Sequence, residues 1–334
     1  MMQAITYRGP EKLEVIEQSK PAVPKGAVLL KISHSGICGT DLNIYAGAHP
    51  RAKAPLIMGH EFSGVVVEDG TQYKAGTPVT VYPLVSCGQC EPCQTGQSHV
   101  CTTLKLLGID FDGGMATYAV VSEDLIIPLK EKVSLKLGAF IEPVAVAVHA
   151  LRKGNYQLGD RSVVFGAGTI GLCVALTLRH YGASRVVVVE TNSFRLKMAA
   201  DMGFETINPM EENEEEVLLE KSEGSGFDLV FDCAGHPSVS EKLTRVVKSC
   251  GHIVMVAAYK KPAPLDLIQG MFKEISMQFV RVYTKKDFEI AAEMIMNVPE
   301  FERIITHELP AAEAQQGFDL LVGQKNAVKV MFTF

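Results

Sequence analysis

The pattern of apolar and polar positions divides the chain into two kinds of region. Up to about residue 80, short β-rich runs at residues 27–32, 64–67 and 79–81 are separated by glycine and proline, without helical periodicity. This pattern predicts a barrel or sandwich of short strands. Loops held on such a scaffold commonly carry functional side chains.

From Arg161 onward the pattern alternates between strands and helices. The run at residues 162–165 has the continuous apolar character of a buried parallel strand, and further strands of the sheet are predicted at 186–189, 227–232 and 252–257. Amphipathic helices are predicted at residues 285–296 and 311–321, before a closing strand at 328–332. The sequence therefore predicts an α/β fold with a parallel sheet, joined to a β-rich region.

One helix is predicted between these two regions, over residues 140–151. It is expected to begin at Pro143, because proline is favoured in the first turn of a helix. Glu142 would then lie at the N-terminus of the helix, where the helix dipole stabilises a carboxylate. The acidic segment at residues 211–216 is expected to start a further helix with a solvated face.

A glycine-rich loop follows the strand at residues 162–165 and opens a helix. Its G-x-G-x-x-G spacing suits a dinucleotide, since the glycines let the backbone approach the pyrophosphate and the helix N-terminus supplies N–H donors. Glu190 ends the next strand, 24 residues after Gly166, where a carboxylate binds the adenosine ribose and disfavours the 2′-phosphate of NADP. Arg195 weakens this preference for NAD, because an arginine could receive that phosphate. The residues predicted to bind the cofactor are Gly166, Gly168, Thr169, Ile170, Gly171, Glu190 and Arg195.

Four cysteines form a compact C-x2-C-x2-C-x7-C cluster: Cys87, Cys90, Cys93 and Cys101. Four thiolates at such spacing predict a closed tetrahedral zinc site, which has a structural rather than a catalytic role. An iron–sulfur cluster also uses four cysteines, but the last cysteine is too distant for the compact ferredoxin run.

A second set of donors is dispersed along the chain: Cys38, His60, Glu61 and Glu142. A catalytic zinc site needs three protein ligands and one open position, and these residues offer the sulfur, nitrogen and oxygen atoms that zinc binds. Each of them alone could be an ordinary buried or surface residue. Their combination with the cysteine cluster and the glycine loop favours a catalytic metal site.

Composition narrows the classes of protein that fit. The chain has 334 residues, enough for two domains, and a net charge of −6, which argues against a nucleic-acid-binding surface. No apolar run reaches the length of a membrane span, and the first ten residues do not resemble a signal peptide, so we expect a cytoplasmic protein with no membrane partner. The eight cysteines are then expected to be reduced, with Cys173, Cys233 and Cys250 in the core.

These motifs occur in the order found in zinc-dependent medium-chain alcohol dehydrogenases, which the whole chain resembles. Glu142 stands where other alcohol dehydrogenases have a cysteine ligand, which resembles the branch of polyol, sugar-acid and threonine dehydrogenases, including those of sorbitol, galactitol-phosphate and galactonate. The resemblance implies a GroES-like catalytic domain at residues 1–145 and 285–334, with a structural zinc lobe at 86–102. It implies a Rossmann NAD-binding domain at 146–284, with the active site in the cleft between the two domains.

The resemblance also assigns roles to single residues. Cys38 and His60 would ligate the catalytic zinc, and Glu61 and Glu142 would share the remaining coordination, directly or through water. Asp41 would orient the histidine ligand, and Thr40 would take the substrate proton.

One position departs from the family pattern. Asn43 occupies the place of a relay histidine, so the outer proton path would use ribose hydroxyls, water or another residue such as His49. His49, Arg51 and Lys53 follow in one loop, which could bind a carboxylate or phosphate or simply be a solvated basic loop.

The expected activity is an NAD-dependent oxidation of a secondary alcohol on a polyol or sugar acid, free or phosphorylated. The expected cofactors are one catalytic and one structural zinc ion and NAD rather than NADP, and the resemblance implies a homodimer or homotetramer. Two alternatives remain open from the sequence. One is an L-threonine 3-dehydrogenase, and the other is a non-catalytic relative that binds a dinucleotide only.

Overall fold

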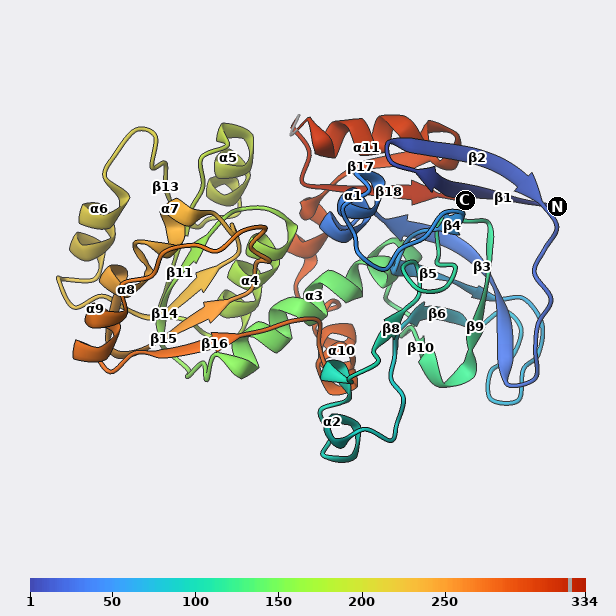
Figure 1. The fold of residues 1–334 in the computed structure, drawn as a ribbon, viewed down its shortest axis with the longest axis horizontal. Coiled ribbons are helices and arrows are strands. Elements are labelled where there is room, and N and C mark those ends of the chain that lie inside the picture. Colours follow the sequence, from blue (N-terminus) through green and yellow to red (C-terminus); the bar gives the residue numbers. More distant parts are fainter. Residues whose placement is uncertain (324–325) are drawn as a thin grey trace. The chain divides into compact units, whose positions relative to one another are not determined.

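A computed structural model of the chain describes residues 1–323 and 326–334. The chain divides into two compact units, one formed by residues 1–142 together with 284–334 and the other by residues 143–283 (Figure 1). The first is β-rich and the second is a parallel α/β unit, so the predicted fold class is confirmed. No helix within the described ranges is long and apolar enough to cross a membrane.

The β-rich unit is built on a seven-stranded sheet in the order β10-β6-β5-β3-β18-β17, with β9 also paired to β3. Its strands are β3 (Ala27–Gly36), β5 (Glu61–Val66), β6 (Pro78–Val81), β9 (Tyr118–Ser122), β10 (Ile126–Pro128), β17 (Ile305–Pro310) and β18 (Lys329–Thr333). β18 runs antiparallel to β3 with Met331 opposite Gly36, and β5 lies on the other side of β3 with Glu61 opposite the same glycine. The C-terminal strand therefore reaches the part of the sheet that carries the candidate ligands.

Smaller elements complete this unit. A three-stranded sheet has the order β2-β1-β4, and β7 pairs with β8. These strands are β1 (Met2–Gly9), β2 (Lys12–Gln18), β4 (Leu56–Ile57), β7 (Leu84–Val85) and β8 (Lys105–Leu106). The helices are α1 (Gly39–Tyr45), α2 (Glu91–Gln94), α10 (Lys285–Met294) and α11 (Ala314–Val322), with 3-10 turns η1 (Ser98–Val100), η2 (Glu123–Leu125), η3 (Pro299–Ile304) and η4 (Ala311–Glu313).

The α/β unit contains a six-stranded sheet in the order β13-β12-β11-β14-β15-β16, in which every neighbouring pair is parallel. Its strands are β11 (Arg161–Phe165), β12 (Arg185–Val189), β13 (Glu205–Ile207), β14 (Phe227–Asp232), β15 (Val247–Met255) and β16 (Ser276–Phe279). Its helices are α4 (Thr169–His180), α5 (Ser193–Asp201), α6 (Glu214–Lys221), α7 (Pro237–Ser240), α8 (Leu243–Val246) and α9 (Leu267–Phe272). The chain order reverses between β11 and β14, which is where open parallel sheets bind ligands.

The prediction for the helix around Glu142 was wrong. Helix α3 (Leu135–Lys153) begins eight residues before Pro143, so Glu142 lies inside the helix and not at its N-terminus. A proline removes one helical hydrogen bond, but the fully buried Phe140 and Ile141 show that packing holds the helix through this position. The dipole argument for Glu142 therefore does not apply.

Two smaller expectations need correction. The acidic segment does start helix α6 with acids in its first turn, and Glu211, Glu212 and Glu216 are exposed. Glu214, however, is buried and pairs with Lys242, because α6 packs beside α8. Cys250 is exposed, in a left-handed backbone conformation with φ of 57°, whereas Cys173 is buried as expected.

Candidate functional site

Cys38 lies at the N-cap of α1, directly after the end of β3. Its backbone is extended, and its N–H donates a hydrogen bond to the Asp41 carboxylate at 2.8 Å. Asp41 is completely buried. This local cap fixes the orientation of the cysteine because an N-cap residue with an acidic partner at N3 satisfies backbone donors that the helix leaves free.

His60 and Glu61 are placed by a glycine turn and a strand. Gly59 has a φ of +94°, and a Cβ there would lie 2.7 Å from Ser35 Oγ and 2.8 Å from Met115 Cγ, so the turn needs glycine. His60 follows this turn, and Glu61 begins β5. Both side chains are buried.

The two segments bring three predicted ligands together. One donor atom each from Cys38, His60 and Glu61 lie within 4.8 Å of one another. The set supplies one sulfur, one nitrogen and one oxygen atom, which is a donor combination that suits zinc. His60 and Glu61 are buried and the three donor atoms converge, so the residues present fit a bound metal ion.

The charges around His60 are arranged to hold a cation. His60 Nδ1 lies 3.9 Å from Asp41 Oδ1, consistent with the orienting role proposed for Asp41. Burial alone would lower the pKa of His60, but the negative charges of Asp41 and Cys38 outweigh it and raise that pKa well above its ordinary value. Burial raises the pKa of Asp41. A positive charge, whether a proton or a metal ion, is therefore favoured beside these groups.

Glu142 lies close to this cluster but outside its tightest grouping. It is a buried residue of α3, and its negative charge raises the pKa of His60 and of Lys329. Thr40 and Asn43 lie on α1, both half-buried, with Thr40 two residues after Cys38. In this conformation the structure groups Glu61, rather than Glu142, with Cys38 and His60.

Lys329 is the charged residue that sequence reasoning missed. It is the first residue of β18, it is 1% exposed, and its ammonium forms an ion pair with Glu61 Oε2. It also donates a hydrogen bond to the Ile37 carbonyl at 2.8 Å. Burial opposes its charge, but the negative charge of Glu61 raises its pKa above the ordinary value. The only available signal was a lysine within an apolar closing strand.

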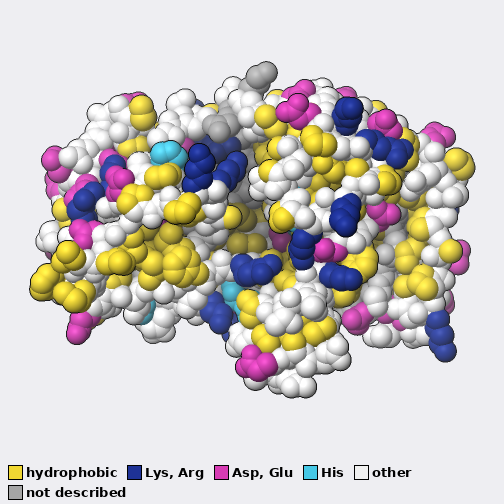
Figure 2. Space-filling model, viewed as in Figure 1, with side chains coloured by type: hydrophobic (Ala, Val, Ile, Leu, Met, Phe, Trp, Pro, Cys, Tyr) yellow, Lys and Arg dark blue, Asp and Glu magenta, His cyan; other side chains and the backbone are white. Residues whose placement is uncertain are grey.

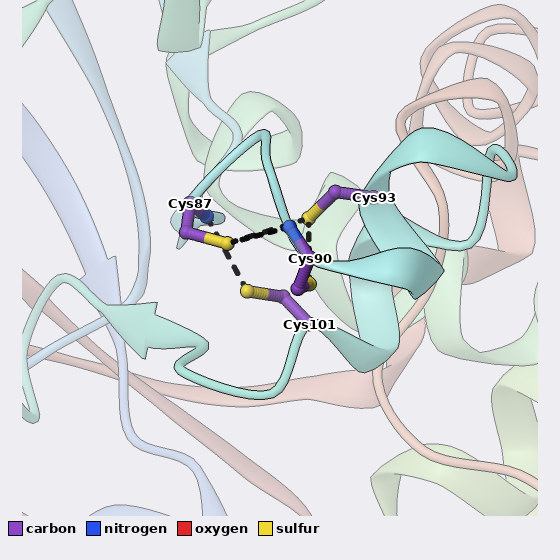
Figure 3. Close-up of side chains that lie close together, drawn as sticks. All are labelled: Cys87, Cys90, Cys93 and Cys101. Carbon is purple, nitrogen blue, oxygen red and sulfur yellow. Dashed lines mark hydrogen bonds between the residues drawn. The ribbon is translucent and has the colours of Figure 1, made fainter.

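The four-cysteine cluster has the geometry that its spacing predicts. Donor atoms of Cys87, Cys90, Cys93 and Cys101 lie within 4.8 Å of one another, and their sulfur atoms converge (Figure 3). Backbone N–H groups point at the sulfurs, from Cys87 to Cys101 Sγ at 3.3 Å and from Cys90 to Cys87 Sγ at 3.4 Å. Hydrogen bonds from backbone N–H groups lower the pKa of Cys90 to about 6, which favours its thiolate form, whereas burial raises the pKa of Cys93 to about 11. The four cysteine sulfurs would fill all four coordination positions of a zinc ion, which leaves no open position for a substrate.

The glycine loop joins β11 to α4 at the edge where the sheet order reverses. Gly166 has a φ of +97°, and Gly168 is the N-cap of α4. A Cβ at Gly171 would overlap the Gly166 carbonyl oxygen, so this glycine allows the helix to pack against the turn. Thr169 and Ile170 occupy the first turn of α4, where backbone N–H groups are available to a phosphate.

Glu190 has a structural task in addition to its predicted one. Its carboxylate accepts hydrogen bonds from the backbone N–H groups of Ala167, Thr191 and Asn192, each at 2.8 Å. It thereby ties the glycine loop to the end of β12. Arg195 approaches the same loop, with Nη1 4.0 Å from where a Cβ of Gly168 would lie.

The loop of His49, Arg51 and Lys53 is largely occupied by its own contacts. His49 Nδ1 accepts a hydrogen bond from Ala52 N at 3.2 Å. Arg51 donates to the Leu104 carbonyl and lies 3.4 Å from Asp110 Oδ2. Because Arg51 is engaged by the segment after the cysteine cluster, the geometry favours a structural role for it over substrate binding.

Comparison with known families identifies the family of the chain. Residues 24–131 match the family model for the alcohol dehydrogenase GroES-like domain, and residues 169–297 match the model for zinc-binding dehydrogenases. The chain belongs to the zinc-dependent medium-chain alcohol dehydrogenase family. The family predicted from the motifs is thus confirmed, as is its class, an NAD(P)-dependent zinc-binding dehydrogenase.

Three relatives illustrate the range of the family around this chain. The 2-dehydro-3-deoxy-L-galactonate 5-dehydrogenase of Pseudoalteromonas atlantica is 33% identical, over 99% of this chain and 98% of that protein. An L-threonine 3-dehydrogenase of Bacillus velezensis is 32% identical, over 90% of each chain. A crystal structure of RspB from Escherichia coli CFT073 in complex with NADH is 32% identical, with a TM-score of 0.93, covering 100% of this chain and 99% of that one.

Proposed function

We propose that this chain oxidises a secondary alcohol of a polyol or sugar acid, free or phosphorylated, with NAD as the hydride acceptor. The observation that supports a catalytic zinc site is the grouping of donor atoms from Cys38, His60 and Glu61 within 4.8 Å of one another. The substrate class is supported by the galactonate-type relative at 33% identity over nearly the whole chain.

The chain's own residues would divide the work of the reaction. A zinc ion held by Cys38, His60 and a carboxylate would supply the Lewis acidity that lowers the pKa of the substrate hydroxyl. Asp41 holds Cys38 and faces His60, and this fixes the ligand geometry. Thr40 would accept the substrate proton through its hydroxyl. Asn43 cannot act as a base near neutral pH, so the proton would leave through water or the cofactor ribose.

The dinucleotide would be held by the loop that follows β11. Gly166, Gly168 and Gly171 leave room for the pyrophosphate at the start of α4, and Glu190 would bind the adenosine ribose hydroxyls. A carboxylate at this position disfavours the additional phosphate of NADP, which supports NAD as the preferred cofactor. The cofactor carries the redox chemistry, while the protein orients it and the substrate.

The test combines metal content with turnover. Wild type should contain two zinc ions per chain and reduce NAD with at least one member of a panel of polyols, aldonates, sugar phosphates and threonine. His60→Ala should contain one zinc ion and lose turnover, while Cys250→Ser, at an exposed cysteine outside both clusters, should retain both ions and activity. A wild-type protein with one zinc ion that survives in His60→Ala, and with no turnover, would contradict the proposal.

Two alternatives have distinct outcomes in that panel. Turnover of L-threonine alone would support a threonine dehydrogenase, which the 32% identical Bacillus velezensis relative favours and Asn43 opposes. Binding of NAD without turnover of any substrate would support a non-catalytic relative. The compact Cys38, His60 and Glu61 cluster argues against the latter.

We further propose that the protein is a cytoplasmic homodimer or homotetramer. The α/β unit presents an apolar surface on α9 and the edge strand β16 (Figure 2). Its most exposed members are Leu267, Ile268, Met271, Phe272 and Phe279, between 65% and 79% accessible. Such a surface beside a free strand edge suits a second copy of the chain. Sedimentation should show an oligomer that Phe272→Glu weakens, and a wild-type monomer would contradict this.

A further inference from the structure

The ion pair between Lys329 and Glu61 lies directly behind the candidate catalytic ligands. Each side chain is 2% exposed, so both charges are removed from water. The pair is built across three neighbouring strands, with Glu61 on β5, Lys329 on β18 and β3 between them. The Lys329 ammonium is further fixed by the Ile37 carbonyl, one residue before the cysteine ligand.

The strand between the two charges is shaped to allow the contact. Gly36 on β3 lies opposite Glu61 in the sheet. A Cβ at Gly36 would overlap Glu61 Oε2 and would lie 2.8 Å from Lys329 Cε. The absence of a side chain at this position therefore leaves the room in which the ion pair forms.

This contact affects how Glu61 can serve a metal ion. One carboxylate oxygen, Oε2, is held by the ammonium, while Glu61 also belongs to the compact group with Cys38 and His60. An ammonium and a metal ion attract the same carboxylate, so each weakens the hold of the other. The buried ammonium can move away only at the cost of losing its own partner.

We propose that Lys329 is a positioning residue that competes with the catalytic metal ion for Glu61 and thereby weakens metal binding. This inference rests on the proposed function, because it requires a metal ion at Cys38 and His60. This role differs from a purely structural one in the direction in which the loss of Lys329 changes metal binding. If Lys329 only stabilised the fold around the ligands, its loss would weaken metal binding. If it competes for Glu61, its loss strengthens metal binding.

The test measures zinc affinity by competition between the zinc-loaded protein and a chromophoric chelator. Lys329→Met should bind the catalytic zinc about tenfold more tightly than wild type, opposite in sign to the roughly 10–100-fold loss of affinity that follows removal of a partner that orients a ligand. Lys329→Arg keeps the charge and should resemble wild type. Lys329→Gln repeats the measurement with a neutral polar side chain, so that the result does not depend on the folding of one variant.

The Glu61→Gln variant shows whether the effect of Lys329 on zinc affinity depends on the Glu61 carboxylate. In Glu61→Gln the carboxylate is absent, and the further change Lys329→Met should then leave zinc affinity unchanged within about threefold, since coupled neighbours are non-additive. The absorption spectrum of the cobalt-substituted protein should also differ between Lys329→Met and wild type, because the Glu61 oxygen approaches the metal more closely. This spectrum is independent of turnover.

The outcomes separate the two proposals. Two zinc ions in wild type, with weaker or unchanged zinc binding in Lys329→Met, would overturn the competition and leave the proposed function intact. Tighter binding of equal size in the Glu61→Gln background would also overturn it, since the effect would then be a general removal of positive charge. A single zinc ion per wild-type chain, retained in His60→Ala, would remove both proposals.

Discussion

Two glycines of the dinucleotide loop offer a matched pair for separating folding from cofactor binding. A Cβ at Gly171 would overlap the Gly166 carbonyl oxygen and would lie 2.9 Å from its carbon, inside the buried face of α4. A Cβ at Gly168 would meet nothing closer than Arg195 Nη1 at 4.0 Å. The same substitution by alanine should therefore affect these two positions in different ways.

The expected size of the first effect follows from two opposing contributions. Overpacking typically costs 1 to 3 kcal/mol, and contact with backbone atoms, which cannot rotate away, places Gly171→Ala near 3 kcal/mol. Alanine regains about 1 kcal/mol through its higher helix propensity. The net loss is then about 2 kcal/mol, which corresponds to a fall of roughly 8 °C in the melting temperature of a unit of this size.

Gly168→Ala should leave the melting temperature of the NAD-free protein within about 1 °C of wild type, because its backbone φ of −73° suits alanine. It should nevertheless weaken NAD binding, since the added methyl group lies on the proposed path of the pyrophosphate. Thermal unfolding without NAD and titration with NAD measure the two effects separately. A Gly171→Ala protein as stable as wild type, or a Gly168→Ala protein that loses equal stability, would refute the reasoning.

The remaining predictions concern the cysteine cluster, the ribose carboxylate and one ion pair. Cys90→Ser should lower zinc content by one ion and reduce stability without altering substrate preference, and a stable variant with changed preference would contradict the structural assignment. Glu190→Ala should lower the ratio of turnover with NAD to turnover with NADP. It should also loosen the glycine loop, which Glu190 ties to the end of β12. An unchanged ratio would exclude the ribose-binding role of Glu190. Burial would raise the pKa of Asp228, but hydrogen bonds from Lys248 and Arg161 lower it below the ordinary value. The stability that ionised Asp228 contributes should therefore be complete above about pH 4 and should decline as the pH falls further. The difference in unfolding free energy between wild type and Asp228→Asn should then shrink below that pH. A difference that stays constant with pH would contradict the assignment.

Much of the fold was readable from the sequence because its signals are local. Apolar runs marked β11 and β12 almost to the residue, since a strand buried on both faces needs mostly apolar side chains. The bounds of β14 were also predicted, although this strand includes Asp228 and Asp232. The glycine loop and the cysteine cluster were equally visible, because each function depends on closely spaced residues. The local shape of the glycine loop and of the cysteine cluster follows from the backbone geometry of these few residues.

Other features were decided by contacts between distant segments. Pro143 suggested a helix start by its local preference, but the packing of Phe140 and Ile141 carries α3 through it. Strand β16 lacked a local signal because it lies at the edge of the sheet, where much of its surface is exposed.

The surroundings of Glu61 depended on tertiary structure in the same way. The sequence alone proposed Glu61 and Glu142 as shared ligands, but it could not show that a lysine 268 positions later would pair with one of them. That contact exists because β18 adds to β3 beside Gly36, and strand pairing over such a separation is set by the whole sheet. The sequence by itself determined which chemical groups this protein carries, and the tertiary structure decided which of their charges meet.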